Sequence, residues 1–167
     1  MGLLLCIVTF ATMLAMSGST EIGIVSSEFE SDAPHVIPAG ETETQTFELS
    51  NAGVLPVVTV AESASSGVTV DQEPTTLHRG ESTNATVGVS APPETGYYLE
   101  SFEEFRYFGV LPTPVVAWLH GIHPWIAMLA TTSVIVGVFV LPFAVLLGTG
   151  SIRTRTRTRS DPTKSIF

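Results

Sequence analysis

The 167-residue chain is poor in cysteine and in lysine, and each shortage excludes a class of site or partner. Its one cysteine, Cys6, lies in an apolar run near the N-terminus. No disulfide can therefore form within the chain, and no cluster of cysteines can hold a metal ion. Its one lysine, Lys164, lies near the C-terminus. Since contacts to phosphates need clustered basic side chains, which the large acidic region lacks, the sequence predicts no nucleic-acid partner for that region.

The charged residues fall into two regions of opposite sign. Residues 20–108 hold fifteen acidic residues against Arg79 and Arg106, a net charge of −13. Residues 149–167 hold five basic residues against Asp161, a net charge of +4. This division predicts that the two regions face different surroundings. An acidic, lysine-poor surface is typical of proteins in concentrated salt, because screening weakens their self-repulsion, so we expect a halophilic source.

A long uncharged stretch before the basic region predicts one transmembrane helix at 125–148. As a helix, Trp125 to Leu147 would be about 35 Å long, against about 30 Å of hydrocarbon in a bilayer. Alternating arginine and threonine residues follow directly. By the positive-inside rule they predict a basic cytoplasmic tail at 149–167 and an exported acidic region. These topology residues are Arg153, Arg155, Arg157 and Arg159.

The N-terminal residues 1–19 fit either a signal peptide or an N-terminal anchor. Leu3 to Met16 is apolar and has the length of a signal-peptide core, and Ala15 and Ser17 offer small residues at positions −3 and −1 of a cleavage site. The basic start of a signal peptide is missing, which is why an uncleaved anchor stays open. With cleavage we expect a single-pass protein of the cell membrane, with its acidic domain extracellular.

Short strands separated by turn residues predict a β-rich exported domain. We interpret 20–40 as a flexible lead-in, with late pairing as an edge strand left open, and 41–110 as an extracellular β-sandwich. Thr42 to Ser50 is a predicted strand that places Phe47 and Leu49 on one face. From Ser82 to Ser90, Ala85, Val87 and Val89 alternate with more polar residues, as expected of a strand with one buried face. The predicted fold class is mainly β. It comprises an immunoglobulin-like (Ig-like) β-sandwich ectodomain, a short interfacial helix and one C-terminal transmembrane helix.

The juxtamembrane segment 111–124 predicts a short interfacial helix. Trp118 and Trp125 are the expected membrane-interface residues, because indole rings favour the level of the lipid headgroups. His120 and His123 are three residues apart and lack an acidic third ligand, so we expect a solvated pair and no metal site.

The remaining side chains suggest one modification site and no catalytic set. Asn84 begins the sequon Asn-Ala-Thr on an outward strand face and is a glycosylation candidate. A Ser-Lys or Gly-x-Ser-x-Gly arrangement is missing from the exported region, so we expect a protein that is not an enzyme. We expect no cofactor, and no small-molecule substrate is evident.

Two stretches carry a resemblance to a known group of proteins. FELSNAGVLPVVTV with LHRGESTNATVGVSAPPETGYY resembles the small extracellular β-sandwich modules of archaeal surface proteins. RYFGVLPTPVVAWLHGIHPW, followed by the span and GTGSIRTRTRTR, is similar to uncharacterised haloarchaeal membrane-anchored proteins, some of them associated with signal-peptidase genes. The resemblance implies a cell-envelope protein that presents its domain to another protein. The alternative is an accessory subunit of a membrane enzyme such as a signal peptidase. The expected partners are the lipid bilayer and an unknown envelope or membrane protein.

Overall fold

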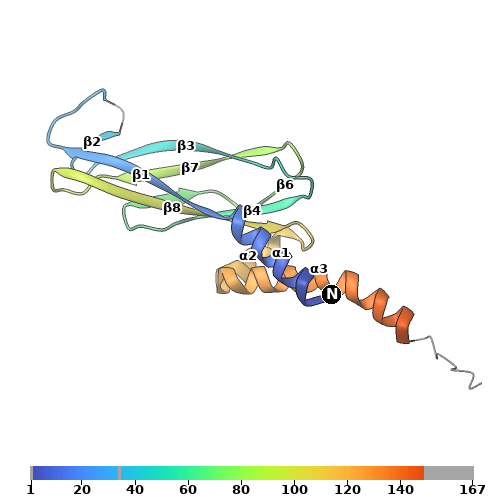
Figure 1. The fold of residues 1–167 in the computed structure, drawn as a ribbon. Helices are drawn as coiled ribbons and strands as arrows, with labels where there is room; N and C mark the ends of the chain where they lie inside the picture. The colour runs from blue at the N-terminus through green and yellow to red at the C-terminus, as the bar shows by residue number, and fades with distance from the viewer. Residues whose placement is uncertain (1, 34, 149–167) are drawn as a thin grey trace, which may run out of the picture.

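The structure is a computed structural model that describes residues 2–33 and 35–148. Over these ranges the chain is mainly β, with two stacked sheets and three helices that lie beside the larger sheet (Figure 1). The elements are, in chain order, α1 (Gly2–Met16), β1 (Gly18–Ser27), β2 (Val36–Pro38), β3 (Thr42–Ser50), β4 (Val57–Ser63), β5 (Val68–Asp71), β6 (Thr75–Leu77), β7 (Ser82–Ser90), β8 (Gly96–Phe108), α2 (Thr113–Ile122) and α3 (Pro124–Gly148).

The larger sheet has the strand order β2-β1-β8-β4-β6. Strands β1 and β8 are antiparallel and pair from Gly18 with Glu104 to Ser26 with Gly96. The expectation of a flexible lead-in over 20–40 is therefore wrong, because β1 lies inside the sheet rather than outside the domain. The physical reason is the alternation of Ile22 and Ile24, whose buried side chains face the smaller sheet.

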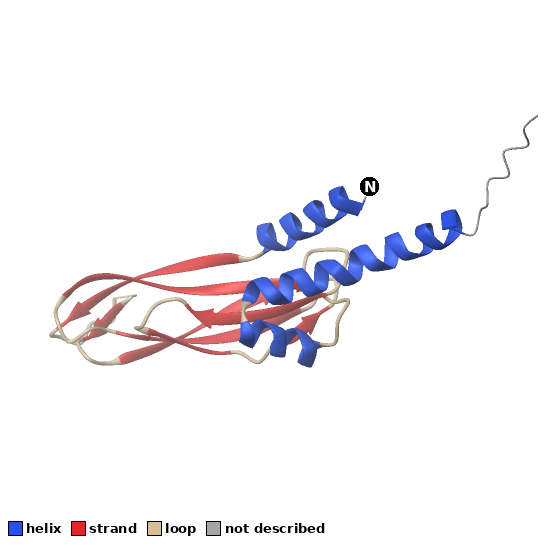
Figure 2. Ribbon diagram, turned by 90° about the horizontal axis from the view of Figure 1, so that it is seen from below, coloured by secondary structure: helices blue, strands red, loops and turns tan. Residues whose placement is uncertain are grey.

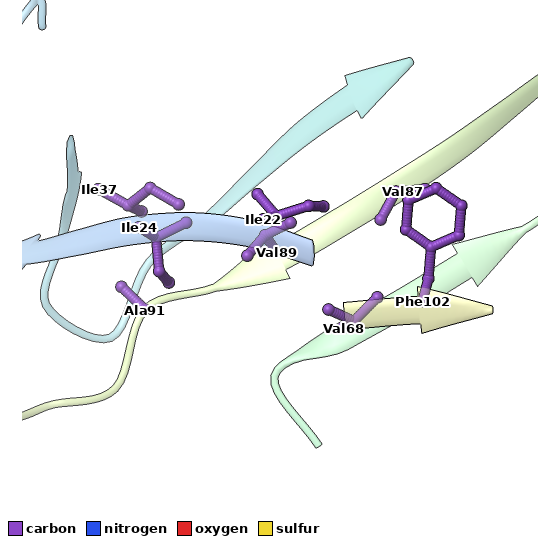
Figure 3. Close-up of a cluster of buried hydrophobic side chains, with 8 residues drawn as sticks. All are labelled: Ile22, Ile24, Ile37, Val68, Val87, Val89, Ala91 and Phe102. Atoms are coloured by element: carbon purple, nitrogen blue, oxygen red, sulfur yellow. The ribbon is translucent and has the colours of Figure 1, made fainter. Parts of the chain in front are cut away.

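The smaller sheet has the order β3-β7-β5, and all its pairs are antiparallel. Strands β3 and β7 have the bounds that the alternation of residues predicts. Ala85, Val87 and Val89 on β7 are fully buried, whereas Asn84 is exposed. The main core between the sheets is shown in Figure 3 and consists of Ile22, Ile24, Ile37, Val68, Val87, Val89, Ala91 and Phe102.

Strand β4 is covered on both faces. Its residues Val57 to Ala61 are all buried, as in a strand with a packed layer on each side. Ala61 packs between the two sheets with Leu49 and Ala85, whereas Val58 and Val60 face the helices. The helices thus form a third layer on part of the larger sheet.

Helix α3 extends beyond the two sheets and the other two helices (Figure 2). Its segment Pro124–Pro142 is long and apolar enough to cross a membrane. The whole of α3 has 25 residues, which at 1.5 Å per residue gives a length of about 37 Å. The arginine tail with Arg153, Arg155, Arg157 and Arg159 lies outside the described residues.

Candidate functional site

The three helices form what we call the helical platform: α1, α2 and α3. One side of the platform packs on β4 and β8 through a second apolar core. The buried members of this core are Met13, Val58, Val60, Tyr107, Val116, Ala127 and Met128. Because these residues come from all three helices and from two strands, the platform and the β-domain share one continuous core.

The other side of the platform is apolar and exposed. Neither α1 nor α3 carries a charged side chain. Side chains more than half exposed are Leu3, Leu4, Ile7, Val8, Trp118, Ile122, Leu129, Val138, Phe139, Leu141 and Val145. Monomeric soluble proteins rarely expose an apolar surface of this extent.

The two tryptophans lie on this platform. Trp118 projects from α2 and is 67% exposed. Trp125 lies in the first turn of α3, is also exposed, and stacks on Phe10 of α1 with ring centroids 5.5 Å apart. Both positions suit an indole at a membrane surface, and their role at the interface stays a prediction.

His120 does not lie in water, and the expectation of a solvated histidine pair is wrong for it. Its side chain turns into the platform core and is only 5% exposed in all. The Tyr107 hydroxyl lies 2.6 Å from its Nδ1. Its Nε2 lies 2.7 Å from Oε1 of Glu62, which is within ion-pair distance. The angle at Nε2 does not allow a ring N–H hydrogen bond to that oxygen. His123 remains exposed, and its Nδ1 accepts a hydrogen bond from the backbone N–H of Trp125.

The environment of Tyr107 keeps its hydroxyl protonated. Burial raises the pKa of Tyr107 above its ordinary value, and the negative charge of Glu62 raises it further. The protonated Tyr107 hydroxyl donates to Nδ1 of His120 in the tautomer that carries its hydrogen on Nε2, and Nε2 faces Glu62. The three side chains join β8, α2 and β4 across the core.

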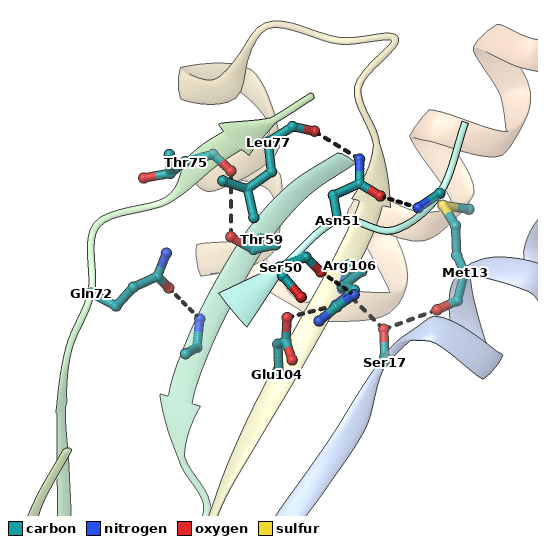
Figure 4. Close-up of polar contacts among 12 residues, drawn as sticks. Met13, Ser17, Ser50, Asn51, Thr59, Gln72, Thr75, Leu77, Glu104 and Arg106 are labelled. Atoms are coloured by element: carbon teal, nitrogen blue, oxygen red, sulfur yellow. Dashed lines mark hydrogen bonds and ion pairs between the residues drawn. The ribbon is translucent and has the colours of Figure 1, made fainter. Parts of the chain in front are cut away.

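A second polar group fixes the junction between α1 and β1 (Figure 4). The Ser17 hydroxyl donates to the backbone carbonyl of Met13 at 3.0 Å, and it accepts the backbone N–H of Arg106 at 3.1 Å. The Arg106 guanidinium in turn pairs with Glu104 at 2.6 Å and donates to the Ser50 carbonyl at 3.0 Å. The end of α1 is thereby tied to both sheets.

Asn51 and Asn84 have opposite environments. Asn51 is buried, and its side-chain amide donates to the carbonyls of Leu55 and Leu77, both at 2.9 Å. Its side-chain oxygen accepts the backbone N–H of Gly53 at 2.9 Å, which closes the turn after β3 (Figure 4). The exposed Asn84 leaves room for a sugar, and its glycosylation stays a prediction.

Comparisons with known proteins leave the site to be interpreted from its own geometry. No family model, curated protein or solved structure matches this chain. Its chemistry therefore has to be argued from the contacts above.

These contacts describe a structural joint beside an exposed apolar surface. Among the residues that the structure describes, no three His, Cys, Asp or Glu side chains gather as metal ligands would. Tyr107 and His120 are closed off by apolar side chains, so a substrate has no access to them in this arrangement. The sequence spacing of His120 and His123 does not predict this joint, because its partners Tyr107 and Glu62 come from β8 and β4.

Proposed function

We propose that this chain is a membrane-tethered cell-envelope protein of a haloarchaeon. It presents an acidic, Ig-like β-sandwich outside the membrane for contact with another protein and is not an enzyme. The observation that carries the proposal is the two-sided platform, whose inner side shares a core with the β-domain while its outer side is apolar and exposed. A bilayer would cover that outer side.

The packing of the platform distinguishes this tether from a flexible linker. Tyr107 contributes to the same core as Val116 of α2 and Met128 of α3. The β-domain is therefore held in one orientation relative to α3. A fixed orientation favours a partner at a defined height above the membrane.

The negative charge of the β-domain and its open sheet edge favour a particular kind of partner. Strand β3 is an edge of the smaller sheet and carries the exposed residues Glu43 and Glu48. An open edge can pair with a strand of another protein, and the carboxylates favour a partner with basic side chains. The Ig-like assignment is supported by the antiparallel order β3-β7-β5 stacked on the larger sheet.

The test is membrane extraction combined with protease protection of intact cells. We expect the chain to stay with the membranes after alkaline washing and its β-domain to be cleaved only from outside. Val138→Arg with Leu141→Arg places two charges on the exposed face of α3 and is expected to weaken membrane retention. The matched control, Thr44→Arg with Thr46→Arg, places the same charges on the exposed side of β3 and is expected to leave retention unchanged.

Two results would overturn this proposal. One is recovery of the unaltered chain in the soluble fraction, and the other is a β-domain protected from external protease. Co-purification in mild detergent then identifies the partner. An envelope protein with a basic surface supports the proposal, whereas a membrane peptidase bound through α3 would support the accessory-subunit alternative instead.

A further inference from the structure

We infer that α1 is retained in the mature protein and lies in the membrane antiparallel to α3. The anchor is then a pair of helices, and the single pass expected from a cleaved signal peptide is replaced by two passes. This inference rests on the proposed membrane location. It adds that the N-terminal helix is a structural part of the protein.

The first support is the burial of Met13. Its side chain is 0% exposed and belongs to the same core as Val58, Tyr107 and Met128. Removal of α1 would take this side chain out of the core and open the platform face of the larger sheet to water. A signal peptide that is cleaved after export would not be expected to complete a core of the folded protein.

The second support is the junction at the predicted cleavage site. Ser17 caps the end of α1 through the Met13 carbonyl and accepts the backbone N–H of Arg106. Strand β1 begins at the next residue, Gly18, and pairs at once with Glu104. Since proteases favour exposed loop tips, this helix-to-strand junction without a loop is a poor site for cleavage.

The third support is the contact of α1 with α3 at two points, Phe10 and Gly2. Phe10 stacks on Trp125 near the domain. At the other end, a Cβ atom added to Gly2 would lie 3.4 Å from Cγ2 of Val140. Figure 2 shows the two helices side by side, leaving the sheets in the same direction. A pair of this kind places Gly2 and the C-terminal end of α3 on one side of the membrane.

The length of α1 is compatible with this position. Its 15 residues measure about 22 Å as a helix, which is less than the hydrocarbon thickness of about 30 Å. A short span is accommodated by local thinning of the bilayer and by association with a longer helix. Helix α3 supplies that longer partner, and the exposed residues Leu3, Leu4 and Ile7 supply a lipid-facing side.

Cys6 provides a direct test, because it is the only cysteine in the chain and lies in α1. The full chain with a C-terminal tag is extracted from membranes, denatured and treated with a maleimide, and its intact mass is measured. We expect one maleimide on a chain that includes α1. An unlabelled chain that lacks about the first 17 residues, as the signal-peptide pattern predicts, would overturn the inference. Thr46→Cys in a Cys6→Ser background is labelled in either case and serves as the positive control.

Cross-linking tests the pairing of the helices separately. In the Cys6→Ser background, Gly2→Cys with Val140→Cys is expected to form an intramolecular disulfide on mild oxidation. Gly2→Cys with Leu129→Cys is the matched control and is expected to stay reduced, because Leu129 lies eleven residues before Val140 on α3. Retention of α1 without the Gly2–Val140 cross-link would overturn the pairing.

Labelling of intact cells tests the two passes. A membrane-impermeant maleimide is expected to modify Thr46→Cys but not Gly2→Cys, each in the Cys6→Ser background. Labelling of both would overturn the two-pass topology. If α1 is lost while the rest of the chain resists alkaline extraction, this inference fails and the proposed membrane tether stands. If the chain is soluble, the tether itself fails.

Discussion

The hydroxyl of Tyr107 and Nδ1 of His120 lie 2.6 Å apart inside an apolar core, so that a polar contact joins β8 to α2 where only packing would be expected. Glu62 approaches the far nitrogen of the same ring from β4. A buried polar pair of this kind favours one arrangement of the elements that carry it, because any shift leaves a polar atom without a partner. The contact therefore fixes how the β-domain sits on its helices.

Separation of Tyr107 from His120 should destabilise the fold. Tyr107→Phe leaves the buried Nδ1 without a partner, and His120→Leu leaves the buried hydroxyl without one, so each should lower the free energy of unfolding by about 1–3 kcal/mol. The double variant should lose less than the sum, because it removes both partners. Denaturant unfolding in detergent measures these changes. Exposed His78→Leu is the control, with an expected change within about 0.5 kcal/mol. Strictly additive losses would show that the pair is not coupled.

Alkaline pH should weaken the same joint. Burial raises the pKa of Tyr107 in the folded chain, so above its ordinary pKa of about 10 the phenol ionises more readily in the unfolded chain. The stabilisation is complete below about pH 10 and is lost as the pH rises toward the folded pKa. Unfolding followed from pH 8 to 11 should show this loss in the unaltered chain and in the exposed control Tyr97→Phe. A loss of equal size in Tyr107→Phe would contradict the assignment.

The sequence predicts those elements whose pattern is local. Alternation locates β3 and β7, and the uncharged run locates α3 to within a residue or two. Strand β1 is missed because its buried alternation is short, from Ile22 to Ser26, and lies between an apolar run and a polar, turn-rich stretch. Its place in the sheet is decided by its partner β8, whose paired residues lie 70 to 86 positions further along the sequence.

The candidate site is less predictable than the fold. The spacing of His120 and His123 does not indicate which of the two side chains turns into the core. Burial of His120 depends on α2 folding back over β4 and β8, which brings Glu62 and Tyr107 to the same ring. A tyrosine at the end of a strand followed by a histidine in the next helix is the only local sign of such a contact.

Helix α1 should contribute to stability through the buried side chain of Met13 and not through the exposed side chain of Leu14. Met13→Ala creates a cavity in the platform core and should cost about 2–5 kcal/mol. Leu14→Ala is the matched control on the same helix, because Leu14 is 47% exposed and outside that core. Thermal unfolding of the purified, detergent-solubilised chain compares the two. Equal losses would indicate that α1 does not pack as described.

Glycosylation of Asn84 should add mass without changing the fold. Its side chain is exposed on β7, so an attached sugar meets no packed neighbour. Protein from a halophilic archaeal host should be heavier than the sequence mass of 17.7 kDa by the mass of the sugar, after any tag or loss of Met1 is counted. Asn84→Gln should remove that excess and leave the unfolding temperature unchanged. An unaltered mass difference in Asn84→Gln would place the sugar elsewhere.

Asn51 should contribute to the stability of the fold, whereas Asn84 should not. Asn51→Ala removes the amide that donates to the Leu55 and Leu77 carbonyls and the oxygen that accepts from Gly53. The Leu77 carbonyl then loses a buried partner, and since each unsatisfied buried group costs about 1–3 kcal/mol, we expect a loss of at least about 2 kcal/mol. Asn84→Ala removes the same atoms from an exposed position and should change the free energy of unfolding by less than about 0.5 kcal/mol. Denaturant unfolding of the two variants side by side decides the matter. A small loss in Asn51→Ala would mean that water replaces the amide and that the turn after β3 does not depend on it.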